Sequence, residues 1–257
     1  MKAGLGPESP AARAVQPSPN HGERRDGRRP DLLLLHYTGM ASAAEALARL
    51  CHPLSEVSCH YLVFEDGRVL QLVPEARRAW HAGASCWAGE RDINSCSIGI
   101  EIVNGGHPHG LPPYPVVQID AVIRLAADLT ARWSIPPQRV LAHSDVAPAR
   151  KEDPGELFPW AALAAAGVGL WVPPVPLGDG RFFSAGDRGP PVEALQAMLA
   201  LYGYDVAVSG AYDDATAAVV TAFQRHFRPE RVDGVADAST ITTLRNLLAA
   251  VRGPREA

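Results

Sequence analysis

The chain has 257 residues, of which 47% are hydrophobic and 20% charged, and its formal net charge is −4. This composition is typical of a globular protein with a buried core. The mild negative charge and the lack of a basic patch argue against nucleic acid and anionic membranes as partners. No segment approaches the roughly 18 apolar residues of a membrane span, and residues 1–30 hold no apolar signal-peptide core. We therefore expect a cytoplasmic protein, or a periplasmic or envelope protein if a leader has been removed.

The chain contains four cysteines, Cys51, Cys59, Cys86 and Cys96, without CxxC spacing. They are too few and too scattered to form a disulfide framework in a chain of this length. We expect free thiols, although disulfide bridges become the alternative if a leader has been removed.

The first two thirds of the chain predict an α/β domain over residues 20–166, after an irregular arm over residues 1–19. Asp31–His36 reads as a buried strand, and Ser42 and Glu45 form a capping box at the start of a helix. The remaining hydrophobic patterns predict strands at 60–64, 68–73, 97–103 and 139–143 and a long amphipathic helix at 119–133. This order describes a mixed central β-sheet with helices on its faces.

The last third of the chain changes in composition. Residues 167–189 are rich in Gly and Pro and read as a semi-rigid linker rather than core. Helical spacing then returns at 192–202, 216–227 and 239–251. We predict a small three-helix domain over residues 190–252.

Two histidines and a carboxylate are candidate metal ligands. His36 and His143 each lie at the end of a predicted strand, and Asp153 follows His143 in a loop. Such ligands suit Zn²⁺ with a fourth position left for water, whose pKa the metal would lower toward about 7. The spacing alone leaves open the alternative that the histidines are hydrogen-bonded structural residues.

Glu101 and Lys151 are further candidates. Glu101 lies on a predicted strand otherwise made of Ile, Gly and Val, so it is paired, solvent-exposed or retained for a reaction. Lys151 lies in a charged loop that is otherwise explained as a solvated charge run. Four other histidines could compete for a metal, but His60 and His81 are expected to pack in the core or at a rim, and the Cys-His pairs match no zinc finger. These four are His52, His60, His81 and His107.

Five ordered motifs carry a resemblance to a known family. They are Leu35-His-Tyr-Thr38, Ser58-Cys-His-Tyr-Leu62, Ala79-Trp-His-Ala-Gly83, Ser97-Ile-Gly-Ile-Glu101 and His143-Ser-Asp-Val-Ala-Pro-Ala-Arg-Lys-Glu-Asp-Pro154. Residues 20–165 thereby resemble the type 2 N-acetylmuramoyl-L-alanine amidases. Gln71-Leu-Val-Pro-Glu75 and Pro154-Gly-Glu-Leu-Phe-Pro-Trp160 bring them closest to the AmiD branch. Beyond the linker, Leu201-Tyr-Gly-Tyr-Asp205 and Ala222-Phe-Gln-Arg-His-Phe-Arg-Pro229 resemble the three-helix peptidoglycan-binding domain of that branch.

The resemblance implies one Zn²⁺ held by His36, His143 and Asp153, with Glu101 and Lys151 as the catalytic pair. It implies cleavage of the lactyl-amide bond between N-acetylmuramic acid, or its 1,6-anhydro form, and L-alanine. The substrate would be peptidoglycan or a soluble muropeptide, in cell-wall turnover or recycling.

Two other functions stay open at this level: a non-catalytic peptidoglycan receptor on the same fold, and an amidase that cuts within the stem peptide. The carboxy-terminal helices have an alternative too, as a bundle that only stabilises the catalytic domain. The sequence also leaves open whether intact wall or imported fragments are the substrate.

Overall fold

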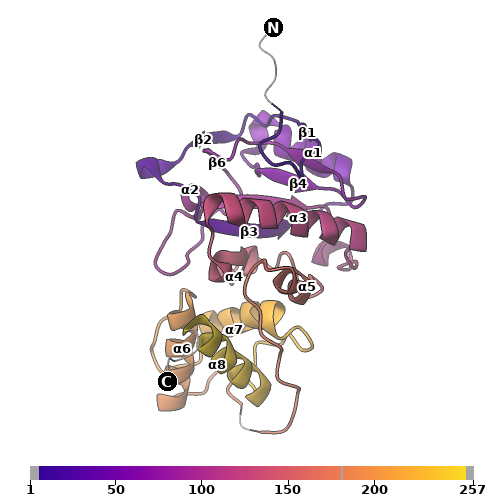
Figure 1. Ribbon diagram of the computed structural model, residues 1–257. Coiled ribbons are helices and arrows are strands. Elements are labelled where there is room, and N and C mark those ends of the chain that lie inside the picture. The colour runs from indigo at the N-terminus through magenta and orange to yellow at the C-terminus, as the bar shows by residue number, and fades with distance from the viewer. Residues whose placement is uncertain (1–5, 181, 253–257) are drawn as a thin grey trace.

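The computed structural model describes residues 6–180 and 182–252 (Figure 1). Positions 1–5 of the predicted arm and position 181 of the predicted linker lie outside the described residues, as do positions 253–257. In Figure 1 the sheet and helix α3 form the upper part of the molecule, and helices α6 to α8 form the lower part. Helices α4 and α5 lie between these two parts.

A mixed six-stranded sheet forms the centre of the larger part, with strand order β1-β5-β4-β7-β3-β8. Strands β4, β7, β3 and β8 run parallel to one another, and β5 is antiparallel to β4. A second sheet pairs β2 with β6. The strands are β1 (Ala14–Val15), β2 (His21–Glu23), β3 (Leu32–Tyr37), β4 (Tyr61–Val63), β5 (Val69–Gln71), β6 (Arg77–Ala79), β7 (Ser97–Ile102) and β8 (Val140–Ala142). The predicted mixed sheet with flanking helices is confirmed.

Helices cover the sheet and build the smaller part. The α-helices are α1 (Ala43–Cys51), α2 (Ile93–Cys96), α3 (Val116–Trp133), α4 (His143–Val146), α5 (Trp160–Ala165), α6 (Pro190–Tyr202), α7 (Asp214–Phe227) and α8 (Ala238–Arg252). The 3-10 helices are η1 (Arg25–Gly27), η2 (Pro53–Ser55), η3 (His107–His109) and η4 (Pro137–Arg139). The three predicted carboxy-terminal helices are α6, α7 and α8.

Local chemistry explains where the predicted elements begin. The Ser42 hydroxyl accepts a hydrogen bond from the Glu45 amide at 3.2 Å and caps α1 as its sequence predicts. The hairpin of β4 and β5 turns through Gly67, whose φ of +80° suits a residue without a Cβ. Its strands are shorter than the sequence pattern predicts.

The two faces of strand β3 enter two different cores. Leu33 and Leu35 pack with the long helix α3 and with the isoleucines of β7. Leu32 and Leu34 lie on the other face, in a core shared with α6, α7 and α8. All four leucines are fully buried, so the smaller helical part covers a sheet face that would otherwise meet water.

The amino-terminal segment is more ordered than the predicted irregular arm. Strand β1 pairs in parallel with β5, and the Ser18 hydroxyl donates to the Leu50 carbonyl at 2.6 Å. The buried Arg24 guanidinium donates to the carbonyls of Glu75 and Ser97, among others. Hydrophobic periodicity cannot reveal this segment because polar groups attach it to the sheet.

The segment after α5 also packs where the sequence pattern predicts a spacer. Val168 belongs to the core under α3, and Val172 belongs to the core shared with the carboxy-terminal helices. The domain boundaries themselves stay predictions.

Two further properties concern the described residues. Within them, every helix is too short or too polar to cross a membrane. All four cysteines are free, and three of them are buried.

Candidate metal centre and catalytic cleft

The candidate site forms where three parallel strands end. In the register of β3 and β7, His36 lies directly opposite Glu101. In the register of β3 and β8, Ala142 lies opposite Leu35, so His143 follows at the level of His36. His143 is the first residue of the short helix α4, one position beyond the end of β8, whereas the sequence predicts it as the last residue of that strand. The carboxyl ends of parallel strands commonly form ligand crevices, and here they bring three chemically active side chains to one level.

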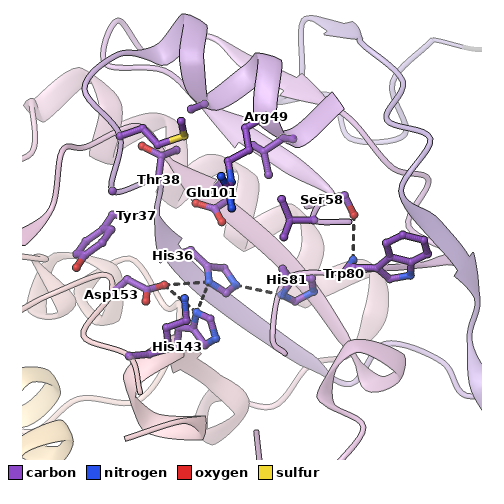
Figure 2. A pocket seen from close by; sticks show the side chains of 16 residues that line it. His36, Tyr37, Thr38, Arg49, Ser58, Trp80, His81, Glu101, His143 and Asp153 are labelled. Atoms are coloured by element: carbon purple, nitrogen blue, oxygen red, sulfur yellow. Dashed lines mark hydrogen bonds and ion pairs between the residues drawn. The ribbon is translucent and has the colours of Figure 1, made fainter. Parts of the chain in front are cut away.

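His36, His143 and Asp153 converge on one point (Figure 2). The Nδ1 atoms of the two histidines lie 2.9 Å apart, and each lies 3.0 Å from Asp153 Oδ2. The three residues are 1%, 2% and 5% exposed. Two imidazole nitrogens and a carboxylate oxygen so close together in a buried site can hold a metal ion.

The protonation states in this cluster suit metal ligands. Burial, followed by the charge of His143, lowers the pKa of His36 to about 4. Burial alone would raise the pKa of Asp153, but His143 and His36 together hold it below its usual range. At neutral pH the cluster therefore presents a neutral imidazole at His36 and a carboxylate at Asp153, the forms that bind metals.

Hydrogen bonds on the far side of each imidazole leave its Nδ1 lone pair free. His143 Nε2 donates to the Ala82 carbonyl at 3.0 Å. His36 Nε2 lies 3.0 Å from His81 Nδ1, and His81 Nε2 lies 3.3 Å from Ser97 Oγ. The Ser97 hydroxyl donates to the Ile93 carbonyl at 2.6 Å, so Ser97 Oγ accepts from His81 and His81 Nδ1 accepts from His36. This chain of donors fixes the tautomer of His36.

Gly99 on β7 makes room for His81. A Cβ at position 99 would lie 2.6 Å from the His81 ring, closer than atoms can approach. From the sequence, His81 is expected to pack in the core or at a rim and has no predicted function. The structure instead places His81 against His36. The only available signal was that His81 belongs to one of the five ordered motifs, Ala79-Trp-His-Ala-Gly83.

Glu101 lies on the floor of the cleft between His36 and Leu62 on the neighbouring strands. Burial, and then the negative charge of Asp153, raise its pKa well above the usual range, while Lys151 opposes the rise. Its Oε2 atom is buried and has no hydrogen-bond partner among the described residues. An unsatisfied buried carboxylate oxygen is costly, which favours a chemical role over a structural one.

The cleft above these residues has a volume of about 510 Å³. Lys151 lines it together with Glu101 and the three metal-ligand candidates, so all five predicted site residues share one cavity. Arg49 and Trp80 line it as well, and neither was predicted as a site residue. Figure 2 shows Arg49 of α1 pointing into the cavity above Glu101.

Three other histidines, His52, His60 and His107, lie outside the cluster. His60 is fully buried, with Nε2 3.1 Å from the Arg24 guanidinium, as expected for a core residue. His52 accepts from the Leu54 amide at 3.2 Å, and His107 lies 3.1 Å from Glu156. In the described part of the chain, the group brought together for a metal is thus His36, His143 and Asp153.

A mixed sheet with a buried His-His-Asp cluster and a carboxylate beside it defines a candidate metallohydrolase. Comparison with known proteins identifies its class. Residues 26–156 match the family model of N-acetylmuramoyl-L-alanine amidase, and residues 188–244 match that of a putative peptidoglycan binding domain. The chain therefore belongs to the N-acetylmuramoyl-L-alanine amidase family.

Individual relatives agree with this assignment. The chain is 42% identical over 225 residues to N-acetylmuramoyl-L-alanine amidase AmiD of Escherichia coli K12, covering 81% of this chain and 79% of that protein. A solved complex of the E. coli AmiD enzyme with anhydro-N-acetylmuramic acid-L-Ala-D-gamma-Glu-L-Lys superposes with a TM-score of 0.73 at 39% identity, covering 86% and 89% of the two chains. The complex of AmpDh3 from Pseudomonas aeruginosa with an anhydromuramic pentapeptide gives a TM-score of 0.71 at 32% identity, covering 87% and 92%.

Proposed function

We propose that this protein is a zinc-dependent amidase that hydrolyses the lactyl-amide bond between N-acetylmuramic acid, or its 1,6-anhydro form, and L-alanine. One observation carries the proposal: His36, His143 and Asp153 converge beside Glu101 on the floor of a single cleft. The muropeptide ligands bound by the two relatives are the support for the substrate class.

The donor set fits zinc. Tetrahedral ligands at about 2.0–2.1 Å from Zn²⁺ would stand roughly 3.3 Å from one another. The observed separations of 2.9–3.0 Å are close to that value, and adjustments of a few tenths of an ångström would complete the fit. When bound, zinc would supply Lewis acidity toward water and the substrate carbonyl.

Glu101 acts as the general base and then the general acid. Its carboxylate accepts a proton from the water that attacks the lactyl carbonyl carbon. The carbon–nitrogen bond then breaks, and Glu101 returns the proton to the departing alanine nitrogen. The products are a lactyl carboxylic acid and the free amine of the L-Ala peptide. The raised pKa of Glu101 matches this role, since a stronger base accepts the proton more readily.

Lys151 stabilises the negative charge that develops on the carbonyl oxygen. It lines the cavity beside the metal ligands, and its ammonium group carries three donors. A preorganised positive charge in a water-poor cleft lowers the energy of a tetrahedral oxyanion more than that of the neutral ground state.

Glu101→Gln tests this proposal because glutamine keeps the shape of the side chain and removes its basicity. We expect kcat on a defined muropeptide to fall by about 100-fold or more, with zinc content and KM unchanged. Removing zinc with a chelator should abolish turnover, and adding zinc back should restore it. Native-rate release of L-Ala peptides by either preparation would contradict the mechanism.

Mass analysis of the products tests which bond is cut. Release of an intact stem peptide with an L-Ala amino terminus supports the lactyl-amide assignment, whereas a shortened stem would indicate an amidase acting within the peptide. Comparing turnover on anhydro-muropeptides and on intact sacculi measures the preferred form. Fractionation of the native protein tests the predicted compartment.

A further inference from the structure

The carboxy-terminal helices contact the loop that carries three of the five proposed site residues. This loop, residues 143–156, holds His143, Lys151 and Asp153. Its first and last parts are joined by the Ser144 amide, which donates to the Asp153 carbonyl at 3.0 Å. In Figure 1, helix α4 at the start of the loop lies against the carboxy-terminal part, facing α7.

Asp145 is the centre of the first contact. It is fully buried, and its Oδ2 accepts from the Ala142 amide at 2.8 Å, at the start of helix α4. From the carboxy-terminal part, the Tyr204 hydroxyl donates to Asp145 Oδ1 at 2.6 Å. His226 Nδ1 lies 2.7 Å from Asp145 Oδ2. A carboxylate two residues from a proposed metal ligand thus takes two of its partners from the other part of the molecule.

Arg225 makes the second contact, at the far end of the loop. Its guanidinium donates to Glu152 at 2.9 Å and lies 3.5 Å from Glu156. Glu152 stands between Lys151 and Asp153 in the sequence. The Arg225 side chain is 13% exposed whereas the Glu152 side chain is 48% exposed, so only the arginine end of this ion pair is shielded from solvent.

Aromatic packing closes the space between these polar contacts. The His226 ring stacks on Trp160 with the ring centres 3.7 Å apart. Trp87 packs edge-on against Tyr204, and the Ala88 amide donates to the Gly203 carbonyl at 2.7 Å. A Cβ on Gly203 would lie 2.6 Å from Trp87, which shows how closely the two parts approach. The two parts are therefore closely packed around Trp87 and Gly203, while a cavity of about 380 Å³ separates Val146 and Arg150 of the loop from Asp205 and Val219.

We propose that Tyr204, Arg225 and His226 are positioning residues that hold the loop 143–156 in the geometry needed for metal binding and turnover. On this view the carboxy-terminal part is a structural portion of the catalytic unit, whatever glycan it also binds. A module that only tethers the enzyme to the wall would need no such contacts with the ligand-bearing loop. The catalytic consequence rests on the function proposed above.

The test uses two matched tyrosine variants of the full-length protein. Tyr204→Phe removes the hydroxyl that donates to Asp145. Tyr212→Phe is the control, because that buried hydroxyl donates at 2.6 Å to the Gly234 carbonyl inside the carboxy-terminal part. Each change deletes one buried hydrogen bond and keeps the ring, and Tyr204→Phe should lower Tm more because its acceptor is a carboxylate.

A second pair varies the other partner of Asp145. His226→Asn keeps an N–H donor near the position of Nδ1, whereas His226→Leu removes it. The measurements are the zinc dissociation constant by chelator competition, kcat and KM on a soluble muropeptide, and hydrogen exchange of the Ser144 and Lys151 amides.

We expect Tyr204→Phe and His226→Leu to raise the zinc dissociation constant about tenfold and to lower kcat severalfold at unchanged KM. Exchange at Ser144 and Lys151 should accelerate in both variants. Tyr212→Phe should leave all of these values within twofold of wild type, and His226→Asn should recover most of the loss. The inference is overturned if Tyr204→Phe behaves like Tyr212→Phe in metal affinity, kcat and loop exchange.

Hydrogen exchange separates this inference from the proposed function. If the wild-type protein neither bound zinc nor cleaved muropeptides, the proposed function would be wrong. The exchange rates of the loop amides in Tyr204→Phe and Tyr212→Phe would still decide whether the carboxy-terminal part holds the loop.

Discussion

His81→Leu should weaken zinc binding although His81 is not a proposed ligand. The substitution removes the acceptor that lies 3.0 Å from His36 Nε2. The buried His36 ring then either keeps an unsatisfied N–H at Nε2 or moves its proton to Nδ1. In the second case the nitrogen aimed at Asp153 and His143 is protonated and must lose that proton before it can bind a metal.

The size of the effect follows from the second alternative, because the zinc-bound form must then restore the unsatisfied N–H that the zinc-free form avoids. A buried donor left without a partner costs about 1–3 kcal/mol. At about 1.4 kcal/mol for each factor of ten, the zinc dissociation constant should rise by roughly 5- to 150-fold. Partner groups of metal-ligating histidines typically account for about 10- to 100-fold in metal affinity, in agreement with this range.

The matched variant is His81→Asn, whose side-chain oxygen can stand near Nδ1 and accept from His36. Gly99→Ala provides an independent perturbation, because its Cβ would meet the His81 ring at 2.6 Å and displace it. Zinc affinity is measured for all three variants by chelator competition, and circular dichroism checks that each is folded. We expect His81→Leu and Gly99→Ala to bind zinc weakly. The zinc affinity of His81→Asn should remain close to that of the wild type. Equal zinc affinities for His81→Leu and His81→Asn would refute the tautomer argument.

Three further results are expected. Lys151→Met should lower kcat by about 100-fold or more while the zinc content measured by atomic absorption stays at the wild-type level. Arg49→Gln should raise KM severalfold for a muropeptide whose γ-linked glutamate has a free α-carboxylate, because Arg49 lines the cleft and its guanidinium has no carboxylate partner among the described residues. KM for the same muropeptide with that α-carboxylate amidated should not change. Burial, and then the charge of Arg24, lower the pKa of His60 from 6.5 to about 3, so its contribution to stability is complete above pH 6.5 and declines as the pH falls toward 3. In urea unfolding, the free energy of unfolding should fall by up to ~1.4 kcal/mol per pH unit through His60 alone as the pH falls from 6.5 toward 3. In His60→Gln the free energy of unfolding should fall less steeply over the same pH range.

The sequence predicted the elements whose stability depends on local patterns. The leucine run that becomes β3, the Ser42 cap of α1 and the three carboxy-terminal helices were all found, because periodicity and capping chemistry are local properties. Strands β1, β2 and β6 were missed. They contain only two or three residues each and depend on partners far away in the sequence. Arg24, for example, anchors the amino-terminal segment to carbonyls of residues 75–97.

The same distinction applies to the site. His36, His143, Asp153, Glu101 and Lys151 were named from strand ends and ordered motifs, and the structure brings all five to one cavity. His81 and Arg49 were not assigned to the site, because their positions depend on how a loop and a helix pack against the sheet. The contacts of Arg225 and His226 with the loop 143–156 lie beyond any local pattern, since the partners are 70 or more residues apart.

The hydrophobic core determines the direction in which Glu101 points. Ile98, Ile100 and Ile102 alternate with it along β7, and all three are fully buried with helix α3. Because successive strand residues face opposite sides, burying these three isoleucines forces Glu101 onto the face that carries His36. A shift of one residue would place Ile100 beside His36 and the Glu101 carboxylate in the α3 core, where an unpaired charge costs several kcal/mol. The apolar packing of β7 therefore places the proposed base on the face of the sheet that carries the metal ligands.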